Sequence, residues 1–325
     1  MNPPIANPRP QSPGELPDGP LVLITGASTG VGLALARRLL AARTDGRRYR
    51  LVLTARESSL ERIEALRDDD SAVFLRPLDV TDDTQRRAVI ADCRDWGGVD
   101  VLVNNAGVAY RSVVEHVQDD ERLAQMSVNF QGPMELARLV LPEMRAKRTG
   151  RIINVSSVGG MMAMPTMAAY SASKFALEGA TESLWYEVRP WNVAVTLIEP
   201  GFLRSDGFTH TVFTRRSQRS MDRLDAAYHQ HYEHMSAFVE KLMRRAFATP
   251  DSVARKIHRV IEARRPPLRV QATLDAHFFS LLRRILPRGL YHELLYRMLP
   301  GISTWGPKPA GSEPMDPEPK EAKPD

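Results

Sequence analysis

The sequence contains a single cysteine, Cys93, among 325 residues. One thiol excludes an internal disulfide framework and a zinc site built from several cysteines, and it suits a reducing compartment. No apolar run approaches the roughly 20 residues that span a bilayer, and residues 1–20 lack the apolar stretch of a secretory signal. We therefore expect a globular, cytoplasmic protein.

Proline is sparse in the middle of the chain and concentrated at its ends. Seven of the 24 prolines lie in residues 1–20 and six lie in residues 306–325. Such segments bury too little apolar surface to offset the entropy lost on ordering. We predict disordered Pro-rich tails over residues 1–19 and 306–325.

Positive charge is also unevenly distributed. The whole chain has a net charge of +5, yet residues 206–305 alone hold 17 Lys and Arg against 9 Asp and Glu. An anionic partner would therefore meet the C-terminal third, although a solvated basic surface explains the excess equally well. We expect no nucleic-acid partner.

Short apolar runs alternate with helical patterns between the tails. The strand candidates are Leu21–Thr25, Arg50–Thr54, Ala72–Leu75, Val99–Val103, Arg151–Val155 and Val193–Ile198. The helical patterns are Val31–Ala42, Ser58–Arg67, Glu121–Lys147 and Tyr170–Arg189. This alternation predicts an α/β fold, a Rossmann-type doubly wound parallel sheet, whose core spans residues 20–205. Uniformly apolar strands agree, because such strands are buried on both faces.

The alternation stops after Pro200. Helical patterns cover 206–247, Thr249–Glu262 and Ala276–Leu299, the last broken at Pro287, with one more strand candidate at Leu268–Val270. We predict that 206–305 is a helical, substrate-covering extension of the same domain, on the side where such sheets bind ligands.

A glycine-rich turn joins the first strand candidate to the first helix. Glycine allows a pyrophosphate to approach the main chain closely, and the following helix N-terminus offers free N–H groups. A plain tight turn is the alternative. We predict a dinucleotide site formed by Gly26, Ser28, Thr29, Gly30, Val31 and Gly32.

The end of the second strand discriminates between the two dinucleotides. An acid there would bind the ribose 2′-hydroxyl and select NAD. This chain has Ala55 followed by Arg56, whose planar guanidinium suits a 2′-phosphate. We predict that NADP(H) is preferred, while Glu57, which comes next, leaves NAD(H) open; an exposed Arg56 without a role is the alternative.

Four more motifs follow in a fixed order. They are Asn104-Asn105-Ala106-Gly107, Asn154-Val155-Ser156-Ser157, Tyr170-Ser171-Ala172-Ser173-Lys174 and Pro200-Gly201. With the glycine turn, the set from Leu21 to Ser205 resembles the short-chain dehydrogenase/reductase family. The resemblance implies hydride transfer between a nicotinamide and the carbon of an alcohol, ketone or aldehyde.

The catalytic residues are expected around Tyr170. Tyr170 and Lys174 are four apart and share a helix face, and a nearby ammonium favours the phenolate of a group whose pKa is otherwise near 10. The resemblance implies that Tyr170 is the acid/base, that Lys174 tunes it and binds ribose, and that Ser157 holds the substrate oxygen. Asn129 would complete the proton relay. Ser156 is the weaker candidate, because its side chain should point the other way.

The resemblance also implies cofactor contacts elsewhere. They come from Asp79, Asn105, Ala106, Gly107, Tyr170, Lys174, Pro200, Gly201 and Ser205. Asp79 has the alternative of a residue at a helix N-terminus before Thr81. Ser205 stands where family members often carry threonine.

A narrower resemblance concerns the substrate. Residues 173–179, the long extension and Pro266-Pro267-Leu268-Arg269 are similar to the branch that holds 17β-hydroxysteroid dehydrogenase type 1 and the retinol dehydrogenases. This implies a bulky apolar alcohol or carbonyl substrate, steroid-, retinoid- or lipid-like, contacted by Ser157, Met164 and Tyr170. A 3-oxoacyl-chain reductase and a non-catalytic dinucleotide-sensing regulator remain alternatives. The methionines near Met164 could instead pack as loop core.

Three further expectations concern the rest of the chain. Arginine, leucine and aromatic residues in 276–297 suit an interfacial helix on anionic lipid, with packing on its own domain or at a subunit interface as the alternative. The histidines of 229–234 form no convincing metal site, and we expect no metal. Family analogy implies a homodimer or homotetramer through Glu121–Lys147 and Tyr170–Arg189.

Overall fold

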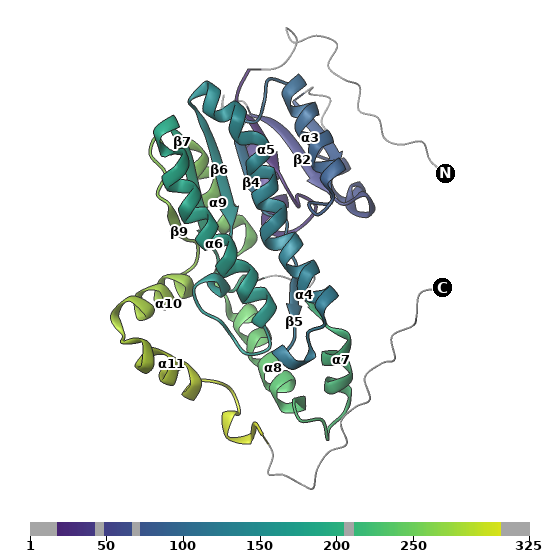
Figure 1. Cartoon of the computed structure of the whole chain (residues 1–325), viewed down its shortest axis with the longest axis vertical. Coiled ribbons are helices and arrows are strands. Elements are labelled where there is room, and N and C mark those ends of the chain that lie inside the picture. Colours follow the sequence, from purple (N-terminus) through teal and green to yellow (C-terminus); the bar gives the residue numbers. More distant parts are fainter. Residues whose placement is uncertain (1–17, 43–48, 67–71, 205–210, 307–325) are drawn as a thin grey trace.

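Figure 1 shows a computed structural model, which describes residues 18–42, 49–66, 72–204 and 211–306. The predicted tails, apart from residues 18, 19 and 306, and Ser205 lie outside the described residues.

Seven parallel strands form the central sheet, in the order β3-β2-β1-β4-β6-β7-β9. They are β1 (Leu21–Ile24), β2 (Arg50–Ala55), β3 (Val73–Pro77), β4 (Val101–Asn104), β6 (Gly150–Val155), β7 (Val193–Glu199) and β9 (Arg269–Gln271). Every strand of this sheet was expected from an apolar run. The doubly wound parallel architecture is confirmed.

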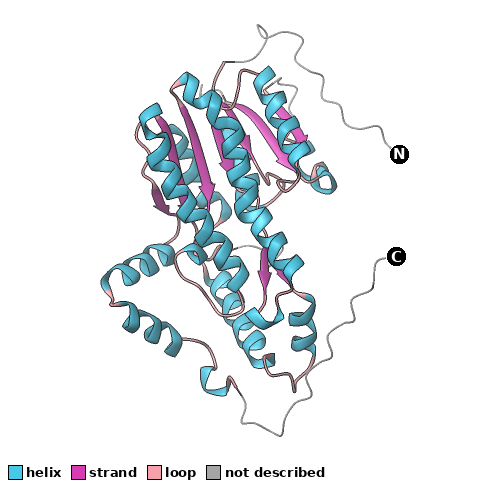
Figure 2. Ribbon diagram, in the orientation of Figure 1, coloured by secondary structure: helices cyan, strands magenta, loops and turns pink. Residues whose placement is uncertain are grey.

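Alternate strand residues face two separate cores, as the pleat requires. Val22 and Ile24 of β1 belong to the core that includes α1 (Gly30–Ala42) and α9 (Pro250–Glu262). Leu21 and Leu23 belong to the core that includes α3 (Asp83–Asp95), α5 (Gly132–Lys147) and α6 (Ala168–Val188). Figure 2 shows helices of the second group covering the near face of the sheet.

Two helical patterns differ from the expectation. The predicted helix over Glu121–Lys147 is divided into α4 (Asp119–Met126), a π-helical turn η5 (Ser127–Gln131) and α5. The Gly132 N–H donates to the Ser127 carbonyl, five residues earlier, and Pro133 has no N–H to donate to the Asn129 carbonyl, so the regular hydrogen-bond pattern is interrupted here. The Ser58–Arg67 pattern yields only η3 (Glu57–Ser59) and α2 (Glu61–Glu64).

Part of the segment 206–305 packs into the core. Within 206–305, α9 packs on α1 and β9 becomes the last strand of the sheet. Beyond the carboxyl edge lie β5 (Ala109–Arg111) with its partner β8 (Thr211–Phe213), then α7 (Arg215–Asp222) and α8 (His229–Arg245). Short 3₁₀ turns η4 (Val114–His116) and η7 (Arg189–Trp191) complete the connections.

The last described residues form an arm. It comprises α10 (Leu274–Ile285), α11 (Arg288–Arg297) and η8 (Ile302–Thr304), and it extends from the end of β9 along one side of the molecule (Figure 1). Among the described residues, no helix has the length and hydropathy needed to cross a bilayer.

Candidate active site

The glycine turn has the geometry that a dinucleotide phosphate needs. Gly26 and Gly30 have φ of +66° and +56°, which favours glycine. A Cβ on Gly32 would lie 2.4 Å from the Gly26 carbonyl oxygen, and one on Gly26 would lie 2.9 Å from the Cα of Ala106. The main chain is therefore bare at the N-terminus of α1, where N–H groups can receive phosphate.

Asn105 holds this turn against the end of β4. Its Nδ2 donates to the carbonyls of Thr25 at 3.0 Å and Gly26 at 3.1 Å. The Thr25 hydroxyl accepts from the backbone N–H groups of Asn105 and Ala106, both at 3.0 Å. The predicted contacts of Asn105 and Ala106 thus meet the predicted glycine turn, and Asn105 supports the turn's shape.

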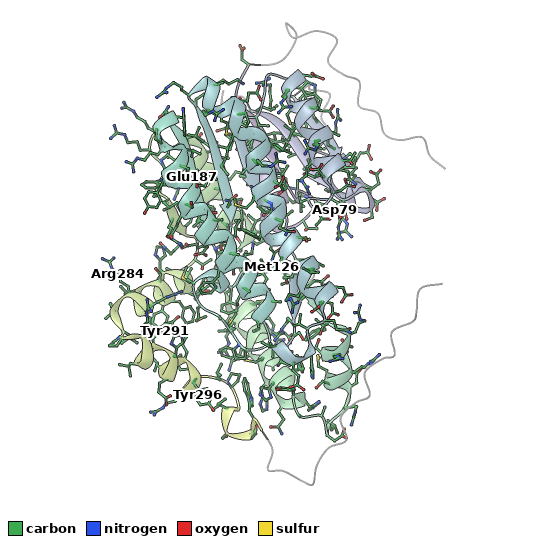
Figure 3. The ribbon with its side chains drawn as sticks, viewed as in Figure 1. Asp79, Met126, Glu187, Arg284, Tyr291 and Tyr296 are labelled. Carbon is green, nitrogen blue, oxygen red and sulfur yellow. The ribbon has the colours of Figure 1, made fainter. Side chains whose placement is uncertain are left out.

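Arg56 lies at the carboxyl end of β2, beside buried Ala55. The side chain is exposed, and its guanidinium has no hydrogen bond or ion pair with any residue that the structure describes. Asp79 lies after the neighbouring strand β3 (Figure 3). Its Oδ1 accepts from the N–H and hydroxyl of Thr81 at 2.9 and 2.7 Å, so the carboxylate also shapes the turn before α3.

Tyr170 and Lys174 lie one turn apart near the start of α6. Lys174 Nζ donates to the carbonyl of Val155 at 2.9 Å and lies 6.0 Å from the centre of the Tyr170 ring. Burial lowers the pKa of Lys174 to about 8, while the Glu178 carboxylate acts to raise it. Lys174 is therefore a buried cation that holds its proton only up to slightly alkaline pH.

Ser157 faces the Tyr170 ring across the turn η6 (Val158–Gly160). A Cβ on Gly159 would lie 2.9 Å from Tyr170 Cε1 and 3.6 Å from Ser157 Oγ, so Gly159 leaves the two side chains room to meet. Burial raises the pKa of the Tyr170 phenol, and a hydrogen bond with the Ser157 hydroxyl lowers it. Ser157 Oγ also accepts from the Gly159 N–H at 3.1 Å.

Asn129 lies in the π-helical turn η5, an irregularity that is frequent at functional sites. Its Oδ1 accepts from the Val108 N–H at 3.0 Å, and its Nδ2 donates to the Val108 carbonyl at 2.9 Å and to Ser173 Oγ at 3.1 Å. A Cβ on Gly107 would lie 3.3 Å from Asn129 Oδ1 and 3.9 Å from Lys174 Nζ. Asn129, Gly107 and Lys174 therefore border one small space.

Ser156 points away from this space, as expected for its position next to Ser157. Its hydroxyl donates to Glu178 Oε1 at 2.7 Å. Arg269 of β9 binds the other oxygen of Glu178 at 2.6 Å, and it also pairs with Glu182 and with buried Glu199. This network places the Glu178 carboxylate one helical turn from Lys174, and Glu178 shares Arg269 with two other carboxylates.

Two residues at this edge were not predicted. Thr273 Oγ1 accepts from the Gly201 N–H at 2.9 Å, and Asp275 Oδ2 accepts from the Phe202 N–H at 2.8 Å. A Cβ on Gly201 would collide with the Asp275 carboxylate. Pro200 is fixed from the other side, because its carbonyl accepts from the Val158 N–H at 2.7 Å. A threonine before an amphipathic helix is an N-cap signal, and Thr273 does cap α10.

Met164 is part of an apolar cluster over η6, close to Ser157. Buried Val158, Met161 and Met162 pack with side chains of the arm. These arm residues are Phe279, Leu282, Leu286, Tyr291 and Leu295. The arm therefore contributes one wall of the apolar surroundings of the site.

The histidines of α8 have other contacts. The His231 ring packs on Trp305 at 4.3 Å between centroids, and Trp305 Nε1 donates to His234 Nδ1 at 3.3 Å. Within the described ranges, no group of three or more His, Cys, Asp or Glu side chains is placed to hold a metal. The end of the arm is thus attached to α8.

Sequence comparison gives related proteins. The family model of short chain dehydrogenases matches residues 20–215. Human retinol dehydrogenase 8 is 33% identical over 287 residues, covering 85% of this chain and 90% of that protein. Human 17-beta-hydroxysteroid dehydrogenase type 1 is 33% identical over 273 residues, covering 81% and 80%.

Solved structures agree with the fold. A short-chain dehydrogenase from Streptomyces avermitilis superposes with a TM-score of 0.72 at 30% identity, covering 86% of this chain and 96% of that one. A metagenomic short-chain oxidoreductase in complex with NADP gives a TM-score of 0.59 at 26% identity, covering 78% and 96%. The chain belongs to the short-chain dehydrogenase/reductase family of oxidoreductases.

Proposed function

We propose that this protein is an NADP-dependent oxidoreductase that interconverts an alcohol and a ketone or aldehyde on a bulky apolar substrate. The observation that carries the proposal is the meeting of Ser157, Tyr170 and Lys174 at the carboxyl edge of the sheet. The Ser157 hydroxyl accepts from the Gly159 N–H, and the Lys174 ammonium donates to the Val155 carbonyl. These main-chain contacts set the positions of both side chains before any ligand arrives.

The described residues fit a nicotinamide dinucleotide. Bare main chain at Gly26 and Gly32 leaves room for pyrophosphate, and the exposed guanidinium of Arg56 is available to a 2′-phosphate. When bound, the nicotinamide supplies or receives the hydride. The metagenomic relative solved with NADP supports the same cofactor choice, and an NAD complex of a structural neighbour keeps NAD(H) as the second cofactor.

The chain's own residues would supply the proton and the orientation. The Ser157 hydroxyl holds the substrate oxygen, and the Tyr170 hydroxyl gives its proton to that oxygen during reduction or takes it during oxidation. Lys174 in its charged form stabilises the phenolate that reduction leaves behind. Asn129 fixes the loop at Val108 beside Lys174 and would complete the proton relay that the family resemblance implies.

The apolar cluster of Met161, Met162, Met164 and the arm supports a bulky apolar substrate, since methionine adapts to irregular ligands. The names of the steroid and retinol relatives point the same way. We also propose a homodimer or homotetramer through α5 and α6, with peripheral membrane contact through residues 276–297.

The test is NADPH oxidation followed at the nicotinamide absorbance with a steroid ketone, a retinal, a long-chain aldehyde and a 3-oxoacyl thioester, each repeated with NADH. We expect turnover of at least one bulky apolar carbonyl, with NADPH preferred. Turnover of the 3-oxoacyl thioester alone would replace the substrate class. Tight NADPH binding without turnover in either direction would instead support a dinucleotide-sensing regulator.

A further inference from the structure

Helix α10 has one packed apolar face and, about 100° around the helix axis from it, a second apolar face that is exposed. Its inner face packs Phe279, Leu282 and the following Leu286 into the methionine cluster over η6. Its outer face carries Leu274, Phe278, Leu281 and Ile285, which are 75%, 53%, 56% and 66% exposed. These four follow the spacing i, i+4, i+7 and i+11, which places them in one stripe along the helix.

An outer stripe of this kind is unusual for a helix whose inner face is already packed. The stripe runs the full 12 residues of α10, about 18 Å at 1.5 Å per residue. Leu290 and Tyr296 of α11, each 56% exposed, continue the apolar surface of the arm. We name Leu274, Phe278, Leu281 and Ile285 the outer stripe.

The charged residues of the arm are mainly positive, with four arginines against Asp275 and Glu293 between residues 274 and 304. Arg284 and Arg288 are exposed and have no ion pair with any described residue, and Figure 3 shows Arg284 on the outer side of the arm. The acids of the arm are already engaged, because Asp275 accepts from the Phe202 N–H and Glu293 pairs with Arg297. A surface that complements this arm would have an apolar interior for the outer stripe and anionic groups at its boundary for the arginines.

We propose that the outer stripe docks α10 onto the surface of a bilayer that contains anionic lipid. An interfacial helix lies in the membrane plane with apolar side chains inserted and basic side chains at the headgroups. Leu274, Phe278, Leu281 and Ile285 would insert, while Arg284 and Arg288 would meet lipid phosphates. The charge complementarity distinguishes a bilayer from a second copy of this basic chain, whose arm would bring like charges together.

Docking of α10 would also bring the candidate active site close to the bilayer surface. The inner face of α10 covers Met161 and Met162 next to Ser157, and the helix N-terminus binds the turn at Gly201. If the proposed function holds, an apolar substrate dissolved in the bilayer would enter the site along the arm; this step rests on the proposed function. Vesicle binding through the outer stripe does not depend on turnover, so it can fail or hold independently of the proposed function.

The test is co-sedimentation of the full chain with vesicles of phosphatidylcholine alone or with phosphatidylserine, at low and high salt. The double variant Phe278→Ser/Leu281→Ser removes the centre of the outer stripe, and Arg284→Gln/Arg288→Gln removes the charges. Phe247→Ser is the control, because Phe247 is 89% exposed but lies after α8 and away from the stripe.

We expect the parent and Phe247→Ser to bind anionic vesicles at low salt and to dissociate at high salt. The stripe variant should lose roughly tenfold or more in partition coefficient, and the charge variant about fivefold for each arginine. Parent protein that stays in the supernatant with anionic vesicles at low salt overturns the proposal. A stripe variant that binds vesicles like the parent also overturns it. If neither the parent nor the stripe variant binds vesicles, and the variant changes from oligomer to monomer by light scattering, the stripe is a subunit interface and the proposal is overturned.

Discussion

The sheet and the arm use apolar residues in opposite ways. In the sheet, apolar residues of β1 are fully buried on both faces, and polar function begins only where the strands end. In the arm, α10 is packed on one face and leaves a second apolar face exposed. Packing within one chain accounts for apolar residues that are buried on all sides. An exposed apolar face is not accounted for in this way and indicates a partner outside the chain.

The two regions also differ in how they position the active site. Strand β6 holds Lys174 through the Val155 carbonyl, the turn η6 that follows it holds Ser157 through the Gly159 N–H, and α6 carries Tyr170 beside them. The arm and its N-cap residue Thr273 contact the same edge through Thr273 and Asp275 on the Gly201–Phe202 backbone, through Arg283 on the Met161 carbonyl and through the methionine cluster. We therefore expect the sheet to determine the chemistry, and the arm to determine which substrates arrive.

Among the comparisons that follow, the largest expected effect on kcat separates Ser157 from its neighbour Ser156. Ser157→Ala should lower kcat roughly 10²–10³-fold, the usual cost of removing a donor to a developing oxyanion. Ser156→Ala should mainly lower stability, by about 1–3 kcal/mol, because Glu178 loses a buried donor. Steady-state kinetics and thermal melts of both variants check this, and equal losses of kcat would contradict the assignment.

The next effect concerns the cofactor end of the sheet. Arg56→Ala should reduce kcat/KM for NADPH about ten- to hundredfold, because a charge-assisted pair with the 2′-phosphate is lost. The value for NADH should barely change, and Arg62→Ala, which removes an exposed arginine of α2, should alter neither. If Arg56→Ala weakens both cofactors equally, Arg56 supports the fold instead of reading the phosphate.

Two glycine substitutions compare how tightly the glycine turn at the sheet edge and the arm are packed. Gly32→Ala should destabilise the protein by about 1–3 kcal/mol, because its Cβ would meet the Gly26 carbonyl and Asn105 Nδ2. Gly289→Ala in α11 has open space around the new methyl and should change stability by less than about 0.5 kcal/mol. Urea unfolding of the two variants measures both values, and similar losses would show that the arm is packed as tightly as the turn.

The smallest effect is a shift in pH dependence. Carbonyl reduction should decline as pH rises through about 8, where Lys174 loses its proton. Because the Glu178 carboxylate acts to raise the pKa of Lys174, Glu178→Gln should move this decline to lower pH. Glu187→Gln, on an exposed part of the same helix, is the control. A decline that stays in place in Glu178→Gln would separate Glu178 from Lys174.

Most of the sheet was predictable because its strands are apolar runs that need no knowledge of distant residues. Strands β5 and β8 were not predicted, since three residues carry no periodicity and their pairing joins Ala109 to Thr211. Helix α3 was also missed, although Asp82 is an N-cap whose side chain accepts from the Gln85 N–H. Its largely polar sequence gives only a weak apolar stripe.

The sequence proposed the residues of the candidate active site but not the residues that support them. Tyr170, Lys174 and Ser157 lie in short motifs with fixed spacing, so the family resemblance located them. Arg269, Thr273 and Asp275 act on the site from about 70 to 90 residues away along the chain, a distance that no local pattern encodes. The composition of 276–297 predicted an interfacial helix, but the sequence did not show which of its apolar residues pack: Phe279 and Leu282 contact the methionine cluster, whereas Phe278 and Leu281 are exposed.

The most direct test of the account is Tyr170→Phe, measured beside Tyr186→Phe, an exposed tyrosine of the same helix. Carbonyl reduction by NADPH and NADPH binding by fluorescence would be measured for both. Tyr170→Phe should lower kcat roughly 10²–10⁴-fold, the range for a lost general acid, with NADPH affinity nearly intact, and Tyr186→Phe should change neither. Turnover of Tyr170→Phe within about a factor of two of the parent would remove Tyr170 from the reaction and contradict the central claim.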